Sequence, residues 1–133
     1  MRILEAGTTL ATQEYVVRRE DLVAYAQASG DHNPIHQDED VARTVGLPGV
    51  IAHGMYTMAL AARAVATWTD DAEVVELGCK FTAPVVVPAE TGVTVVVAGV
   101  VKSVADGCAT IVLEVTCGGE KVLGAPKAVV RVG

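Results

Sequence analysis

The chain has 133 residues, of which 51% are hydrophobic and 4% aromatic, and its formal net charge is −6. This length fits one domain over residues 1–133, with a core of aliphatic side chains. The charge argues against general binding of nucleic acid or of an anionic membrane, since both need a basic surface. No apolar run approaches the ~20 residues of a membrane span, because Arg63 interrupts the best candidate. We expect a cytoplasmic protein, since no signal peptide is evident and the three cysteines form no CxxC pair.

The first half of the chain favours helices and loops after one short strand. The strand is predicted at residues 12–18 and a helix at residues 20–29, where apolar side chains recur at spacings of three and four. A polar loop at residues 30–36 leads to a short helix that Asp38 can cap. A longer helix begins at Gly54. Both of its faces are rich in alanine or other apolar residues, which predicts a helix buried nearly all round.

The second half, residues 73–132, alternates with a period of two and predicts strands. Asp106-Gly107 and Gly118-Gly119 fit tight hairpin turns. Pro126 in the last strand predicts an edge position or a bulge, since proline cannot donate to a sheet. A long helix against a largely antiparallel sheet makes the fold class α+β. Because one sheet covers only one side of that helix and leaves edges exposed, pairing with a second copy is expected.

The loop GDHNPIH, residues 30–36, holds two of the chain's three histidines and one acid. On a helix, Asp31 and His36 would point about 140° apart, so they can meet only where the chain is not helical. Pro34 removes a backbone donor and pushes Asn33 out of the helical region. The bend can therefore bring carboxylate and imidazole together, with a water between them for acid–base chemistry. The alternative is a polar surface turn with no chemical role.

The stretch IAHGM, residues 51–55, places His53 and Gly54 at the start of the long helix. The first amides of a helix have no internal acceptor and lie at the positive end of its dipole. Glycine leaves the Gly54 amide open to close approach by a substrate carbonyl. The alternatives are that Gly54 only relieves crowding at the helix entry and that His53 is a buried structural histidine.

These two stretches together closely resemble the hydratase motif of the MaoC-like, R-specific enoyl-thioester hydratase/dehydratase family. The flanking segments EDLVAYAQASGD, DEDVARTVGLPGV and ELGCKFTAPVVVP continue the similarity. The resemblance implies a single hot-dog fold, in which a curved antiparallel β-sheet wraps around a long central α-helix. Within the family, the chain looks most like the catalytic subunit of bacterial (3R)-hydroxyacyl-acyl carrier protein dehydratases.

By position, the resemblance implies that Asp31 and His36 form the catalytic dyad that activates water. It implies that the Gly54 backbone N–H donates to the thioester carbonyl, that Asn33 orients the dyad and that His53 supports it. The implied reaction is reversible syn addition of water to a trans-2-enoyl thioester, which gives a (3R)-3-hydroxyacyl thioester. No cofactor is implied beyond the CoA or phosphopantetheine that carries the acyl group.

An acyl substrate also needs an apolar tunnel, for which Met55 and Met58 of the long helix are candidates beside the plainer alternative of core packing. No metal is expected, because the spacing of the acid and the histidines matches no usual zinc pattern. The expected partners are an acyl-CoA or acyl-acyl carrier protein substrate and a second hot-dog subunit, as a homodimer or heterodimer. A hot-dog thioester hydrolase and a non-catalytic partner subunit remain alternative functions.

Overall fold

A computed structural model describes residues 4–132 of the chain. Its first half contains one strand and three helices, and its second half contains strands, as the sequence predicts. The elements in chain order are β1 (Thr9–Val17), α1 (Arg19–Ser29), the 3-10 turn η1 (Pro34–His36), α2 (Glu39–Thr44), α3 (Gly54–Thr69), β2 (Val74–Phe81), β3 (Val93–Ala105), β4 (Cys108–Cys117), β5 (Glu120–Lys121) and β6 (Leu123–Arg131).

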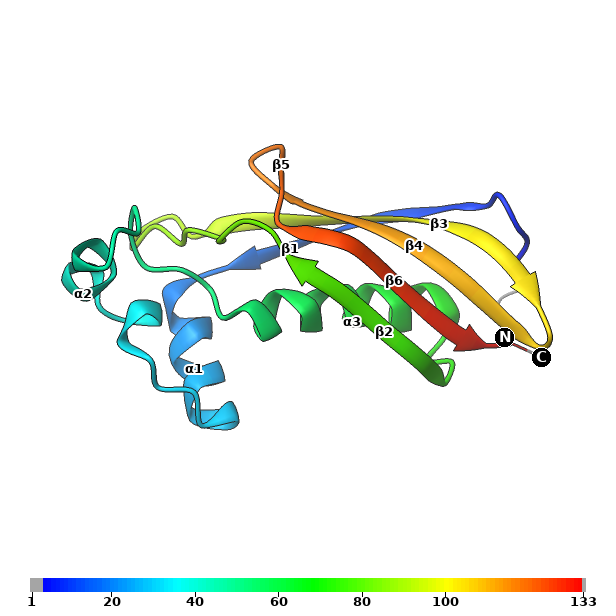
Figure 1. Ribbon diagram of the computed structural model, residues 1–133, viewed down its shortest axis with the longest axis horizontal. Coiled ribbons are helices and arrows are strands. Elements are labelled where there is room, and N and C mark those ends of the chain that lie inside the picture. Colours follow the sequence, from blue (N-terminus) through cyan, green and yellow to red (C-terminus); the bar gives the residue numbers. More distant parts are fainter. Residues whose placement is uncertain (1–3, 133) are drawn as a thin grey trace.

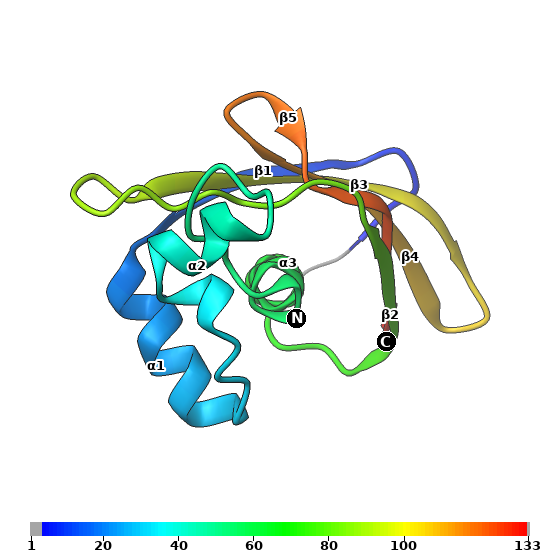
Figure 2. The ribbon, with the colours of Figure 1, turned by 60° about the vertical axis from the view of Figure 1, so that its left-hand side comes forward.

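The strands form one antiparallel sheet in the order β1-β3-β4-β6-β2, and the short β5 pairs with β4. Figure 1 shows the sheet running over α3, with α1 and α2 at one end. Figure 2 looks nearly along α3 and shows the sheet bending around it from β1 to β2. This is the hot-dog fold, and it confirms the predicted α+β class and the predicted central helix.

The core lies between the concave face of the sheet and α3. Alternate residues of the central strands are fully buried, among them Val97 of β3 and Ile111 of β4. They face the buried side of α3, where Trp68 is the largest fully buried side chain. Gly99 is required at this contact, because a Cβ there would lie 2.7 Å from the Trp68 ring. The small residue therefore lets helix and sheet approach closely.

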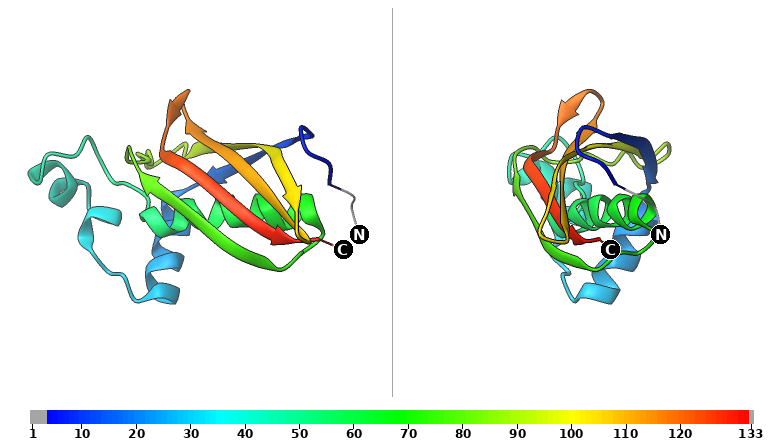
Figure 3. Two further views of the ribbon diagram at one scale, coloured as in Figure 1. Left: turned by 45° about the vertical axis from the view of Figure 1, so that its right-hand side comes forward. Right: turned by 90° about the vertical axis from the view of Figure 1, so that its right-hand side faces the viewer.

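The prediction that the central helix is buried nearly all round is wrong. Met55, Ala59, Arg63 and Thr67 recur every four residues and form an exposed stripe along α3. Figure 3 shows the reason, since the sheet covers the helix from above and from one side only. Alanine occurs on exposed and on buried helix faces, so an alanine-rich face does not by itself predict burial.

The two predicted hairpin turns are confirmed. Residues 106–107 join β3 to β4 and residues 118–119 join β4 to β5, and all four residues have positive φ. Positive φ at both central positions matches the strand twist of two-residue hairpins, which is why Asp-Gly and Gly-Gly are favoured there. Among the described residues, no helix is long and apolar enough to cross a membrane.

Pro126 lies in an interior strand, so the edge alternative is wrong and the bulge alternative is correct. β6 is hydrogen-bonded between β4 and β2. In the β2–β6 register, Gly78 pairs with Lys127 and Lys80 with Gly124, which leaves Ala125 and Pro126 opposite a single residue of β2. The proline therefore occupies a position where the sheet does not need its missing N–H.

Candidate active site

The segment that follows α1 is held in an extended turn by local hydrogen bonds. Gly30 ends the helix in the left-handed conformation, with φ 80°. The Asp31 amide donates to the Ser29 hydroxyl at 3.2 Å, and the Asn33 amide donates to Oδ1 of Asp31 at 3.2 Å. Short polar side chains compete with the helix for backbone groups in this way. The Asp31 carboxylate is thus oriented by its own loop.

Pro34 starts a single 3-10 turn that carries His36 at its end. The Asn33 side chain caps this turn by accepting from the Ile35 amide at 3.2 Å. The prediction of a non-helical loop therefore holds for residues 30–33, whereas residues 34–36 form one tight turn. The difference has a simple cause, since proline is favoured at the first position of a helical turn. His36 is buried beneath this turn.

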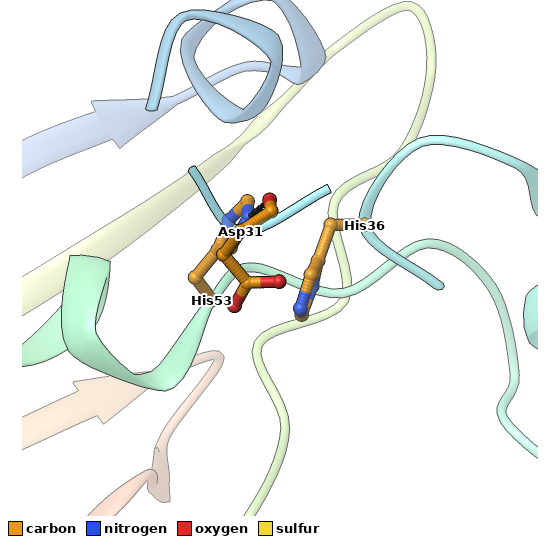
Figure 4. Close-up of side chains that lie close together, drawn as sticks. All are labelled: Asp31, His36 and His53. Carbon is orange, nitrogen blue, oxygen red and sulfur yellow. Dashed lines mark hydrogen bonds between the residues drawn. The ribbon is translucent and has the colours of Figure 1, made fainter. Parts of the chain in front are cut away.

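His53 connects the two members of the predicted dyad. Its Nε2 lies 3.1 Å from the main-chain carbonyl of Asp31, and its ring stacks on that of His36 with centroids 3.8 Å apart and an interplanar angle of 25°. Figure 4 shows the three side chains together, with the Asp31 carboxylate turned toward His36. The Tyr25 ring also packs against His53, tilted by 58° with centroids 4.8 Å apart. The sequence indicates a supporting residue at position 53 but does not reveal the stacking.

The tautomer of His36 follows from its hydrogen bond. Its Nδ1 lies 2.8 Å from the carbonyl of Ile51, which can only accept, so Nδ1 carries the proton. Burial lowers the pKa of His36, against the opposing effects of the Ile51 carbonyl and of Asp31. The ring is therefore neutral at neutral pH and keeps a free electron pair on Nε2. That nitrogen is a competent general base.

Asp31, His36 and His53 bring possible metal-ligand atoms within 4.8 Å of one another. The ring geometry fits a metal poorly. An imidazole binds a metal in its own plane, and two rings stacked at 3.8 Å direct their electron pairs side by side rather than toward one point. In addition, Nδ1 of His36 and Nε2 of His53 already contact main-chain carbonyls. The cluster is better suited to moving protons than to holding a cation.

Gly54 is the first residue of α3, directly after His53. The first hydrogen bonds at this end come from the amides of Tyr56 and Thr57, both to the His53 carbonyl. The Gly54 amide precedes them and so has no acceptor within the helix. It lies at the positive end of the dipole of a 16-residue helix. The amide can therefore stabilise negative charge on a ligand oxygen.

Two cavities meet at Gly54. The Asp31 cavity, of about 380 Å³, is also lined by Tyr25, Ser29, His53, Met55 and Phe81. The His36 cavity, of about 300 Å³, has mostly apolar walls from the segment before α3, the segment after β2 and the start of β6, including Ile51, Ala52, Val85 and Leu123. Thr57, which is buried, also lines it. The arrangement offers an acid–base pair, an anion-stabilising amide and apolar space in one place.

The predicted site residues fall into two groups. Asp31, His36, His53 and Gly54 lie together, and Met55 lines the Asp31 cavity. Met58 of α3 is half-buried and lines neither cavity. The helix alanines do not line them either, so loops and strand ends supply the apolar walls.

Phe81 and Thr57 are cavity residues that the sequence does not reveal. Phe81 reaches the site only because β2 pairs with β6. Nothing near position 81 in the sequence signals that contact. Thr57 follows Gly54 by one helical turn and therefore shares its face. That spacing was the one available signal for it.

The fold and this group of residues define a hot-dog protein with an acid–base site at the start of its central helix. Residues 4–120 match the MaoC like domain, and the chain belongs to this family. Over 71 residues it is 42% identical to 3-hydroxyacyl-thioester dehydratase X of Mycobacterium tuberculosis, a match that covers 53% of this chain and 25% of that protein. The chain therefore spans only part of the length of this curated relative.

Solved structures agree with the family. A MaoC-like dehydratase superposes with a TM-score of 0.94 at 36% identity, over 98% of this chain and 41% of that one. The R-hydratase PhaJ1 from Pseudomonas aeruginosa superposes with a TM-score of 0.84 at 27% identity, over 97% of this chain and 83% of that one. The chain is thus a member of a dehydratase and hydratase family with the hot-dog fold.

Proposed function

We propose that this chain catalyses the reversible hydration of trans-2-enoyl thioesters to (3R)-3-hydroxyacyl thioesters. The observation that carries the proposal is the geometry of His36, whose Nδ1 donates to the Ile51 carbonyl, which groups with Asp31 and which lines one cavity with Gly54. Hydration needs a base for water and a donor for the thioester oxygen, and these groups supply both. The R-hydratase and 3-hydroxyacyl-thioester dehydratase among the relatives support the same reaction class.

In the hydration direction, the thioester carbonyl accepts from the Gly54 N–H and a water lies between Asp31 and His36. His36 Nε2 takes one proton of the water while its oxygen bonds to C3, and the water's other proton is hydrogen-bonded to Asp31. The electron pair of the C2–C3 double bond moves to the carbonyl, which forms an enolate stabilised by the Gly54 amide. The enolate collapses as C2 takes the proton back from His36.

This sequence of events explains the expected stereochemistry. One imidazole both removes the proton and returns it, so hydrogen and hydroxyl reach the same face of the double bond. The addition is therefore syn. Dehydration follows the same path in reverse, with protonated His36 assisting the departure of the 3-hydroxyl group. Atoms and charge balance without any added cofactor.

We also propose that the chain works as a dimer, either with a second copy or with another hot-dog subunit. The exposed stripe of α3 begins at Met55, which lines the Asp31 cavity, so a partner on this stripe would border the site. Either CoA or an acyl carrier protein fits as the carrier. The free cysteines, Cys79, Cys108 and Cys117, support a reducing, cytoplasmic location.

The proposal is tested by incubating the purified chain with crotonyl-CoA and following the loss of the enoyl ultraviolet absorbance. The 3-hydroxybutanoyl product is resolved by chiral chromatography, and the R enantiomer is expected. Free CoA is measured in the same reaction with a thiol reagent. Release of CoA without hydration would favour a thioester hydrolase. A folded chain that forms a homodimer but is inactive on both crotonyl-CoA and crotonyl-acyl carrier protein would contradict the proposal, whereas an inactive monomer would indicate a missing partner subunit.

A further inference from the structure

Phe81 lies at the junction of the two cavities. Among residues 4–132, only Gly54 and Phe81 line both of them, whereas Asp31 lines one and His36 the other. Three ring atoms of Phe81 lie 3.0, 3.1 and 3.3 Å from the position that a Cβ on Gly54 would take. The ring therefore packs against the backbone of Gly54, beside the amide that is the proposed carbonyl donor.

Phe81 lies at the edge of the sheet and outside the core. It is the last residue of β2, an edge strand, and its side chain is 56% exposed. A large aromatic side chain with this exposure is not required to fill the core. Its ring lies instead against the glycine at the start of α3. The ring thus acts as a wall on the site rather than as part of the core.

The proposed reaction makes this wall important. C1 of the substrate must lie at the Gly54 amide, and C3 must lie between Asp31 and His36. C2 is the atom between them, so it must cross the junction that the Phe81 ring narrows. A substituent on C2 adds width at that point, whereas extra carbons beyond C3 extend into the His36 cavity.

We propose that Phe81 is the specificity-determining residue that restricts this site to acyl thioesters without a branch at C2. The inference rests on the proposed function and goes further by naming the substrate class. A close-packed wall discriminates by width, because overlap with a ring at van der Waals distance cannot be relieved without moving it. A preference of tenfold or more for one methyl group is within the usual range of about 10–200-fold.

The test compares crotonyl-CoA with tiglyl-CoA, which differs from it only by a methyl group at C2. The ratio of the two kcat/KM values is measured for the wild type, Phe81→Ala and Phe81→Leu. We expect the wild type to prefer crotonyl-CoA and Phe81→Ala to narrow the preference by about tenfold. The ratio for Phe81→Leu should lie between those of the wild type and Phe81→Ala. This variant decides the test if Phe81→Ala does not fold. Val16→Ala is the control, since Val16 lies on the other edge strand and is 54% exposed.

An unchanged ratio in a folded Phe81→Leu or Phe81→Ala variant would overturn the inference and leave the proposed function standing. If the wild type hydrates neither CoA ester, binding tests the Phe81 wall independently of activity. In that case the affinities for butanoyl-CoA and 2-methylbutanoyl-CoA are compared by calorimetry. Weaker binding of the branched ester, relieved in Phe81→Ala, supports the wall, and equal binding in both proteins contradicts it.

Discussion

The His53 ring stacks on the His36 ring with centroids 3.8 Å apart, while its Nε2 contacts the main-chain carbonyl of Asp31 at 3.1 Å. One buried side chain thus touches both members of the proposed dyad through different atoms. Its Nδ1 is buried without a hydrogen-bond partner. A buried polar atom without a partner costs stability, so a histidine at this position favours a role beyond packing.

We predict that His53→Phe keeps the ring contact with His36 and removes the hydrogen bond to the Asp31 carbonyl. Phenylalanine keeps the ring for stacking and removes the unpartnered Nδ1, so the free energy of unfolding should change by no more than about 1 kcal/mol. The donor to the Asp31 carbonyl is lost, so kcat for crotonyl-CoA should fall by about tenfold or more with a smaller change in KM. His53→Ala should lose about 2–4 kcal/mol in urea unfolding as well. Wild-type kcat in His53→Phe would show that this hydrogen bond does not position Asp31.

The dyad itself is tested by Asp31→Asn and His36→Gln. The side-chain oxygen at position 31 in Asp31→Asn can still accept from the Asn33 amide, so the loop should keep its conformation while the negative charge is lost. We expect each variant to reduce kcat by about 10²–10⁴-fold, the usual contribution of an acid–base group. Circular dichroism should confirm that both remain folded.

The matched control for the acid is Asp38→Asn. Asp38 likewise accepts from a backbone amide, at the start of α2, and lines neither cavity. This variant should keep wild-type turnover. Equal losses in Asp31→Asn and Asp38→Asn would mean that loop stability, not chemistry, explains the effect.

The pH dependence of hydration should report the lowered pKa of His36. Burial disfavours the charged ring, so protonation of the free enzyme occurs below the ordinary histidine value of 6.5. Because the base must be neutral, kcat/KM should stay level as the pH falls to 6.5 and decline only at lower pH. A decline as the pH rises through this lowered pKa would instead indicate that His36 must be protonated in the hydration direction.

The same shift has a consequence for stability. Between the lowered pKa of folded His36 and the ordinary value, the unfolded chain binds more protons than the folded chain. The stabilisation that His36 contributes is therefore complete above pH 6.5 and is lost as the pH falls through the folded pKa. Thermal melts across this range should show a shallower acid decline in His36→Gln than in the wild type. Identical slopes would mean that His36 does not have a lowered pKa.

Much of the site is local in sequence and was therefore predictable. The bend at Asn33 and Pro34 and the open amide of Gly54 follow from backbone preferences within a few residues. Three features were not predictable in this way. The stacking of the two histidines depends on how the segment before α3 returns to the loop, and the contact of Phe81 with Gly54 depends on strand pairing. The exposed stripe of α3 depends on where the sheet ends.

The role of the Gly54 amide can be tested with unusual clarity because of where Gly54 lies. It is the first residue of α3, a position that tolerates proline. The preceding residue, His53, has φ −60° and ψ 136°, which is the conformation that a following proline requires. Gly54→Pro should therefore remove the N–H without breaking the helix. Gly54→Ala is the matched control, since its Cβ meets the same Phe81 ring atoms but its N–H remains.

We expect Gly54→Pro to lower kcat by about 10²–10³-fold, as the loss of one oxyanion donor typically does. Gly54→Ala should lose much less, because the exposed Phe81 ring can move by the few tenths of an ångström that the new methyl group needs. Phe81→Leu should restore part of the lost kcat when it is combined with Gly54→Ala, and none of it when it is combined with Gly54→Pro. Equal losses in Gly54→Ala and Gly54→Pro would mean that crowding against Phe81, and not the missing donor, causes the defect.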